Sequence, residues 1–204
     1  CEDIRTISRA IVLIGFESIR LISLSVSLID GLLSRGPRYQ LPELLARSFH
    51  AAVQARNIAG YVLSKDQEEV FIAALLHHIG ELAFWACGGD QADELDDVLA
   101  EPGADINTAV RKVLGTSFEQ LTQGLVKNWN LGPVASLAHA PANTLTPAAY
   151  AVQLGMRISE VALDGWESPA MDELVLQLAK FTGITAEEAL QQVLASADES
   201  AFSS

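Results

Sequence analysis

The chain has 204 residues, of which 50% are hydrophobic and 19% are charged, a composition that excludes a disordered chain. Two cysteines exclude a disulfide scaffold or a cysteine-rich zinc module, and a formal net charge of −13 argues against nucleic-acid binding across the whole surface. The charge is unevenly distributed. Residues 1–65 contain 8 Lys/Arg and 5 Asp/Glu, whereas residues 66–204 contain 5 and 21.

Apolar residues recur at steps of three and four along nearly the whole chain, which predicts an all-α fold. The first predicted helices cover residues 4–14 and 16–35, although residues 21–28 also alternate as a strand would. A break at 34–37 (Ser-Arg-Gly-Pro) separates them from a long predicted helix over residues 41–64.

The next predicted helix, about residues 67–87, is apolar on nearly every side and should be the central, buried helix of a bundle. Asp66 is expected to cap its first turn. The segment is the longest candidate for a membrane span, but His77, His78 and Glu81 lie near its centre, where a charge is costly in a bilayer. A buried core helix is therefore the better interpretation.

Shorter helices are predicted after Gly88-Gly89. The acid-rich segment 90–101 is a solvated helix or loop, and its charges favour a solvated face over a docking or calcium site. Capping boxes are predicted for Thr116 with Glu119 and for Thr185 with Glu188. The remaining predicted helices cover residues 106–114, 118–129, 132–139, 148–163, 170–180 and a last segment after Thr185.

The chain begins at Cys1 without a methionine, which indicates a fragment or a processed product. A mature lipoprotein also begins at cysteine, but Cys1 leads directly into a helical pattern with no tether. No charged-then-apolar signal segment with a cleavage site is present, so we expect a cytoplasmic protein.

The sequence contains no glycine-rich phosphate loop and no nucleophile elbow. Gly88-Gly89 follows a predicted helix and is typical of a helix end. Cys87 lies at the end of that apolar helix, so we expect it to be buried and inert.

The four histidines are His50, His77, His78 and His139. On a helix, His77 and His78 point roughly 100° apart, so only one of them could face a given site. Glu81 lies one turn after His77 and could share its face. Two ligands fall short of the three that a catalytic zinc usually needs, and the alternative is a polar spot that hydrogen-bonds to neighbouring helices.

Residues 73–82 (Ala-Ala-Leu-Leu-His-His-Ile-Gly-Glu-Leu) are similar to the Gly-Leu-Leu-His-Asp-Ile-Gly-Lys-Leu signature of the HD superfamily. Residues 7–15 resemble the Ile-x-x-Ala-Ile-x-x-Leu-Gly segment of the HDOD domain. Further landmarks follow in the family's order: Ser48, Ala52 and Ala55; Leu114-Gly115; Gly124-Leu125; residues 129–133; and His139-Ala140-Pro141.

The resemblance implies an HD-like multi-helix bundle in which residues 1–204 form one domain. Residues 1–40 would be a remnant of an N-terminal lobe or connecting helices, residues 41–165 the HD-like core, and residues 166–204 C-terminal helices. Since such domains normally have several helices before residue 7, we expect the missing lobe to leave apolar surface on the first two helices. Another chain, such as a second copy, or another segment would meet that surface.

Departures from the family pattern bear on function. Catalytic HD proteins hold metal with a His, a His-Asp pair and a later Asp. The resemblance places Arg47 at the first His and His78 at the Asp, with His50 out of register. Ala140 replaces the second His of the His-His-x-Pro element, and the later Asp has no counterpart.

His77 and His139 are therefore the clearest survivors of a vestigial site that also includes Arg47 and His78. An arginine repels a divalent cation, and loss of the Asp removes a hard anionic ligand. The resemblance accordingly implies no catalytic residue and no metal or other cofactor.

Three functions remain open. The first is a non-catalytic regulatory module of bacterial signal transduction that contacts a protein partner or an attached receiver or cyclic-nucleotide-turnover domain, without nucleic acid or membrane. The second is a phosphohydrolase with a divalent metal on His50, His77, His78, Glu81 and His139. The third is a nucleotide or small-anion sensor in which Arg47 contacts the anion rather than forming a salt bridge.

Overall fold

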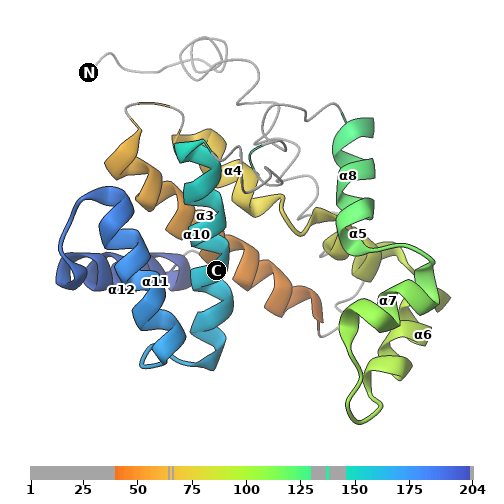
Figure 1. Ribbon diagram of the computed structural model, residues 1–204. Helices are drawn as coiled ribbons and strands as arrows, with labels where there is room; N and C mark the ends of the chain where they lie inside the picture. Colours follow the sequence, from red (N-terminus) through yellow and green to blue (C-terminus); the bar gives the residue numbers. More distant parts are fainter. Residues whose placement is uncertain (1–39, 64, 66, 130–136, 138–145, 203–204) are drawn as a thin grey trace.

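The computed structural model describes residues 40–63, 65, 67–129, 137 and 146–202 (Figure 1). These residues fold into helices, and none of them lies in a strand, so the all-α prediction is confirmed. The helices are α3 (Gln40–Val62), α4 (Gln67–Leu75), α5 (Ile79–Cys87), α6 (Asp90–Leu99), α7 (Ile106–Leu114), α8 (Phe118–Asn128), α10 (Pro147–Val161), the 3₁₀ turn η2 (Ala162–Asp164), α11 (Pro169–Thr182) and α12 (Ala186–Phe202).

Several sequence predictions fall outside the described residues. These are the helices over 4–14 and 16–35, the apolar surface expected on them, the cap at Asp66, and most of the segment 132–139 with His139.

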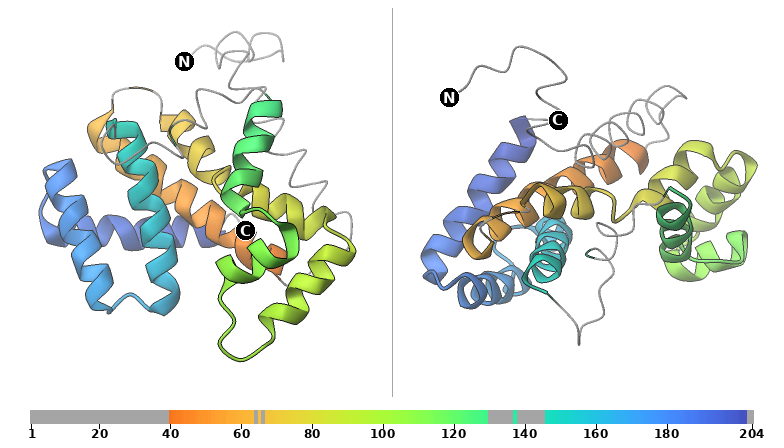
Figure 2. Two further views of the ribbon diagram at one scale, coloured as in Figure 1. Left: turned by 45° about the vertical axis from the view of Figure 1, so that its right-hand side comes forward. Right: turned by 90° about the horizontal axis from the view of Figure 1, so that it is seen from above.

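Helix α3 connects two hydrophobic cores. Figures 1 and 2 show α6, α7 and α8 beside one end of α3, and α11 and α12 beside the other. Leu41 and Leu44 in its first turns pack with α5, α6 and α7, whereas its later residues, such as Ala55 and Ile58, pack with α4, α10, α11 and α12. One helix therefore holds both halves of the described structure together.

The helix predicted over residues 67–87 is two helices, α4 and α5, bent by 40°. At the bend, Ile79 N–H donates to the Leu76 carbonyl at 3.1 Å, three residues back instead of four. The Gly80 N–H, which would bond to Leu76 in a continuous helix, donates instead to Thr122 Oγ1 on α8 at 3.1 Å. A side chain inserted into the hydrogen-bond ladder thus accounts for the break.

Helix ends follow the sequence in most places, with one correction. Thr185 and Glu188 form the predicted capping box, with Glu188 N–H bonded to Thr185 Oγ1 at 3.2 Å and Thr185 N–H bonded to Glu188 Oε2 at 2.8 Å. The box predicted for Thr116 and Glu119 is wrong by one residue, because Ser117 is the N-cap and its partner is Gln120. Glutamine serves this role as glutamate does.

The acid-rich segment, expected to be either a helix or a loop, is the helix α6. Helix α6 buries Ala92 and Leu95 against the smaller core, while most of its carboxylates face solvent. Among the described residues no single helix is long and apolar enough to cross a membrane; α4 and α5 meet the criterion only as a bent pair.

Helices α3 and α10 approach each other through small residues. A Cβ atom on Gly155 of α10 would lie 2.7 Å from both the Ala51 carbonyl oxygen and the Ala55 backbone nitrogen of α3. Such a distance leaves no room for a side chain. The glycine at 155 and the alanines at 51 and 55 therefore set the spacing of the two helices.

We predict that Gly155→Ala lowers the free energy of unfolding by roughly 1–3 kcal/mol, because the added methyl meets backbone atoms that can move only with their helix. Gly124→Ala is the matched control, since Gly124 lies in α8 with nothing near its Cβ position. The control should stabilise the protein by about 0.5–1 kcal/mol. Urea denaturation measures both; equal effects would contradict the packing argument.

Candidate functional site

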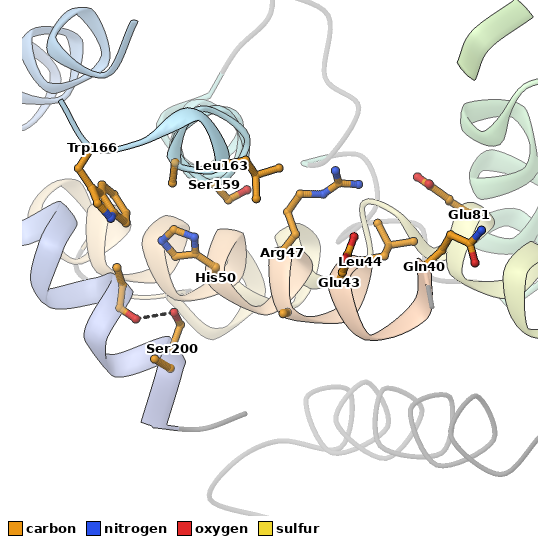
Figure 3. Close-up of a pocket in the computed structure, with 14 residues that line it drawn as sticks. Gln40, Glu43, Leu44, Arg47, His50, Glu81, Ser159, Leu163, Trp166 and Ser200 are labelled. Atoms are coloured by element: carbon orange, nitrogen blue, oxygen red, sulfur yellow. Dashed lines mark hydrogen bonds between the residues drawn. The ribbon is translucent and has the colours of Figure 1, made fainter. Parts of the chain in front are cut away.

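A pocket of about 780 Å³ lies between the first half of α3 and the last turns of α12, and we call it the α3–α12 pocket (Figure 3). Glu81 of α5 and residues from the end of α10 to Trp166 complete its wall. Glu43, Arg47 and His50 reach it from α3 because steps of four and three residues place them on one helix face. The pocket therefore gathers residues from α3, α5, α10, η2 and α12, and from the turn that holds Trp166.

Arg47 brings a permanent positive charge into the α3–α12 pocket. Its Nε is buried and has no hydrogen-bond partner, and no carboxylate of the described residues lies within ion-pair distance of it. Its charge nonetheless acts on Glu81: burial raises the pKa of that carboxyl, and the charge of Arg47 opposes this rise. Arg47 is thus oriented toward the pocket without being tied to a neighbouring acid.

Glu81 is an acid that lines both the α3–α12 pocket and the cavity of His77 and His78. Burial raises the pKa of the Glu81 carboxyl above its ordinary value, although the charge of Arg47 and a hydrogen bond from Trp85 act in the opposite direction. Its Oε2 lies 3.7 Å from Nδ1 of His78. The sequence analysis expected that Glu81 could share a face with His77, and the structure places both residues on the wall of one small cavity.

The bend also changes how the two adjacent histidines lie. The rings of His77 and His78 meet edge to face with centroids 4.9 Å apart, and both line a second cavity of about 250 Å³ together with Glu81 and Thr122. A regular helix would have pointed them apart, so the expectation that only one could face a site is wrong. Thr122 also donates to the His77 carbonyl at 3.5 Å, which fixes the turn.

His50 belongs to the α3–α12 pocket and not to the cavity of the other two histidines. Nε2 of Gln54 lies 2.8 Å from the Val193 carbonyl of α12 and 3.0 Å from Nε2 of His50. A carbonyl only accepts, so the Gln54 amide nitrogen donates to both, and His50 Nε2 is the acceptor. Burial lowers the pKa of His50 and so favours the neutral ring. Because Nε2 accepts from Gln54, the proton of the neutral ring is on Nδ1.

The structure separates the residues that the metal hypothesis needed. Within the described part of the chain, no three His, Cys, Asp or Glu side chains are grouped so that they could hold an ion. His50 lines one cavity, His77 and His78 line the other, and only Glu81 reaches both. His139 lies outside the described residues.

Three residues of the site escaped the sequence analysis. Gln54 is fully buried within the apolar face of α3, and a glutamine in an apolar stripe was a usable signal. Thr122 and Trp166 carried no such signal, because their partners lie on distant segments. Cys87, expected to be buried, is exposed because the last residue of α5 faces outward.

A family model for the HDOD domain matches residues 2–141, more than half of the chain. The chain belongs to the HDOD domain family. The resemblance found in the sequence is thereby confirmed, and no curated protein matches the chain.

Two solved structures share the fold of this HDOD domain. A "putative phosphohydrolase" from Shewanella amazonensis matches with a TM-score of 0.63 and 19% identity, over 97% of this chain and 76% of its own. An HDOD domain protein of unknown function from Geobacter sulfurreducens matches with a TM-score of 0.59 and 19% identity, over 96% of this chain and 67% of its own. At this identity the likeness supports the HD-like fold alone.

We predict that His50 makes the protein less stable in mild acid. Because burial lowers its pKa in the folded state, the unfolded chain binds a proton more readily as the pH falls below about 6.5, and the free energy of unfolding decreases. The stability that neutral His50 contributes is fully present above that pH, and it is lost as the pH falls toward the folded-state pKa of His50.

Denaturation at about pH 7.5 and about pH 5.5 tests this. His50→Gln, which keeps an acceptor for Gln54, should show a smaller loss of stability between the two pH values than the unchanged protein. Acids such as Glu188, whose pKa is lowered by its hydrogen bonds to Thr185, titrate equally in both proteins. Their effect on the free energy of unfolding therefore cancels when the two proteins are compared. Identical pH slopes would show that His50 plays no part.

Proposed function

We propose that this HDOD domain is a non-catalytic regulatory module of bacterial signal transduction that acts in the cytoplasm. The single observation that carries the proposal is Arg47, which brings a guanidinium into the pocket from the helix position where the resemblance expects a metal ligand. The domain would pass its signal by contact to a partner protein, a second copy or an attached signalling domain.

Electrostatics supports the loss of metal chemistry. A divalent ion about 5 Å from a guanidinium is repelled by roughly 7 kcal/mol at an effective dielectric constant of about 20. Glu43 and Glu81 are the acids that line the pocket, and burial raises the pKa of the Glu81 carboxyl, which weakens its contribution to offsetting this repulsion. The described residues therefore offer a poor site for a hard cation, whereas the helical scaffold around it is retained.

The competing function is a metal-dependent phosphohydrolase, the activity that the name of the Shewanella amazonensis neighbour suggests. It would need His50, His77, His78, Glu81 and His139 to converge on an ion. His50 lines one cavity and His77 and His78 line the other, with Glu81 in both, and this separation of the histidines favours the regulatory proposal.

We predict that protein purified without chelator contains far less than one equivalent of transition metal and does not hydrolyse bis(p-nitrophenyl) phosphate in added Mn²⁺. The double variant Arg47→His, His78→Asp restores the ligand types that the resemblance expects. It should bind Mn²⁺ at least about tenfold more tightly than the unchanged protein, since a repulsive charge becomes a ligand and a carboxylate is added.

The matched control is Arg157→His, Gln177→Asp, which makes equivalent changes on the exposed faces of α10 and α11. Its Mn²⁺ affinity should equal that of the unchanged protein. Stoichiometric metal in the unchanged protein, together with turnover that His77→Ala abolishes, would refute the proposed function.

A further inference from the structure

The α3–α12 pocket has the size and the uneven lining of a small-molecule site. Its volume of about 780 Å³ lies within the range of ligand pockets. Figure 3 shows Trp166 and His50 toward one end, Gln40 and Glu81 toward the other, and Arg47 between them. The pocket therefore suits a molecule with a flat apolar body and a charged group.

Arg47 determines the sign of that charge. A buried guanidinium nitrogen without a hydrogen bond is energetically costly, and its Nε is in that state. The guanidinium lines the pocket, and an oxyanion there would accept charge-assisted hydrogen bonds from it, the interaction by which arginine binds carboxylates strongly. His50 adds a further donor at Nδ1, because its Nε2 is engaged as an acceptor by Gln54.

The acids of the pocket limit how much negative charge can enter. Glu43 and Glu81 line it together with one arginine, so a dianion such as a phosphate monoester would meet two carboxyl groups against a single cation. A carboxylate carries one charge. Burial raises the pKa of Glu81, so its carboxyl takes up a proton more readily than an exposed one when an anion binds.

Helix α12 forms a wall of the pocket, and several polar contacts hold it to α3. Val193 accepts from Gln54, Asn57 donates to Ser196 at 3.0 Å, and Tyr61 donates to Gln192 at 3.1 Å. Few of its apolar side chains are fully buried, and Leu190 and Leu194 remain 39% and 38% exposed. Helices with little apolar burial separate from a fold at low cost.

From these observations we propose that the α3–α12 pocket binds a small aromatic monocarboxylate and that the ligand fastens α12 to α3. A ligand that touches both walls binds only the docked arrangement and therefore increases its population. The pocket residue His50 is already joined to the α12 backbone through Gln54, so the pocket and the helix respond together. This inference extends the proposed function by naming the signal and the element that moves.

Isothermal titration calorimetry of the full chain with three related probes tests the binding step. Naphthylacetate should bind saturably at one site, its uncharged amide naphthylacetamide about tenfold or more weakly, and the dianion naphthyl phosphate more weakly than the carboxylate. Arg47→Gln should weaken naphthylacetate binding roughly 10- to 100-fold and leave the amide unchanged. Arg157→Gln, on the exposed face of α10, is the charge-matched control and should change nothing.

A second variant covers the case in which Arg47→Gln fails to fold. Ala197→Leu places a larger side chain into the pocket from α12 without altering charge, and it should weaken both naphthylacetate and naphthylacetamide. The proposal is overturned if naphthylacetate does not bind saturably at millimolar concentration, if Arg47→Gln leaves its binding unchanged, or if naphthyl phosphate binds more tightly.

Hydrogen exchange tests the coupling to α12. Saturating naphthylacetate should slow exchange of the amides of residues 186–202, while those of α6, which lies in the other core, stay unchanged. Unchanged exchange in α12 at full saturation would overturn the coupling. None of these measurements involves metal or turnover, so their failure is distinguishable from failure of the proposed function.

Discussion

The close crossing of α3 and α10 is the constraint on which the described structure depends. Gly155 brings the α10 backbone against Ala51 and Ala55 of α3, closer than any side chain would allow. This contact fixes α10 along α3 and so places the end of α10 opposite the pocket residues of α3.

A second contact organises the other half of the site. Thr122 of α8 accepts the Gly80 N–H and thereby interrupts an apolar segment that would otherwise continue as one helix. Gly80 is required there, since a Cβ on it would lie 2.5 Å from the Thr122 backbone nitrogen. The bend places both His77 and His78 in one small cavity and leaves Glu81 between the two cavities.

The chemistry of the site follows from these placements. A guanidinium, a largely buried carboxyl and a neutral histidine do not form a metal centre, but they can receive an anion in a partly apolar pocket. His50 and Gln54 join the pocket to the backbone of α12. The proposed ligand binding and its proposed coupling to α12 rest on this arrangement.

Local sequence patterns determined a large part of the described fold. The period of the apolar residues placed α3 and α7, since one buried helix face requires that spacing, and the Thr185–Glu188 box was identified because both partners lie within one turn. The choice between Thr116 and Ser117 failed because adjacent hydroxyls are equally able to cap and Gln120 is as good a partner as glutamate.

The ordered motifs also identified the family, and the same motifs pointed to Arg47 and His78 as departures from a metal site. Only the tertiary structure decided how the site residues group. The bend depends on Thr122, which lies 42 residues from Gly80 in sequence, and the position of His50 depends on Gln54 and on a carbonyl of α12, 139 residues from Gln54. Helical periodicity describes how a residue relates to its own turn, whereas these contacts join segments whose proximity exists only after the helices have packed.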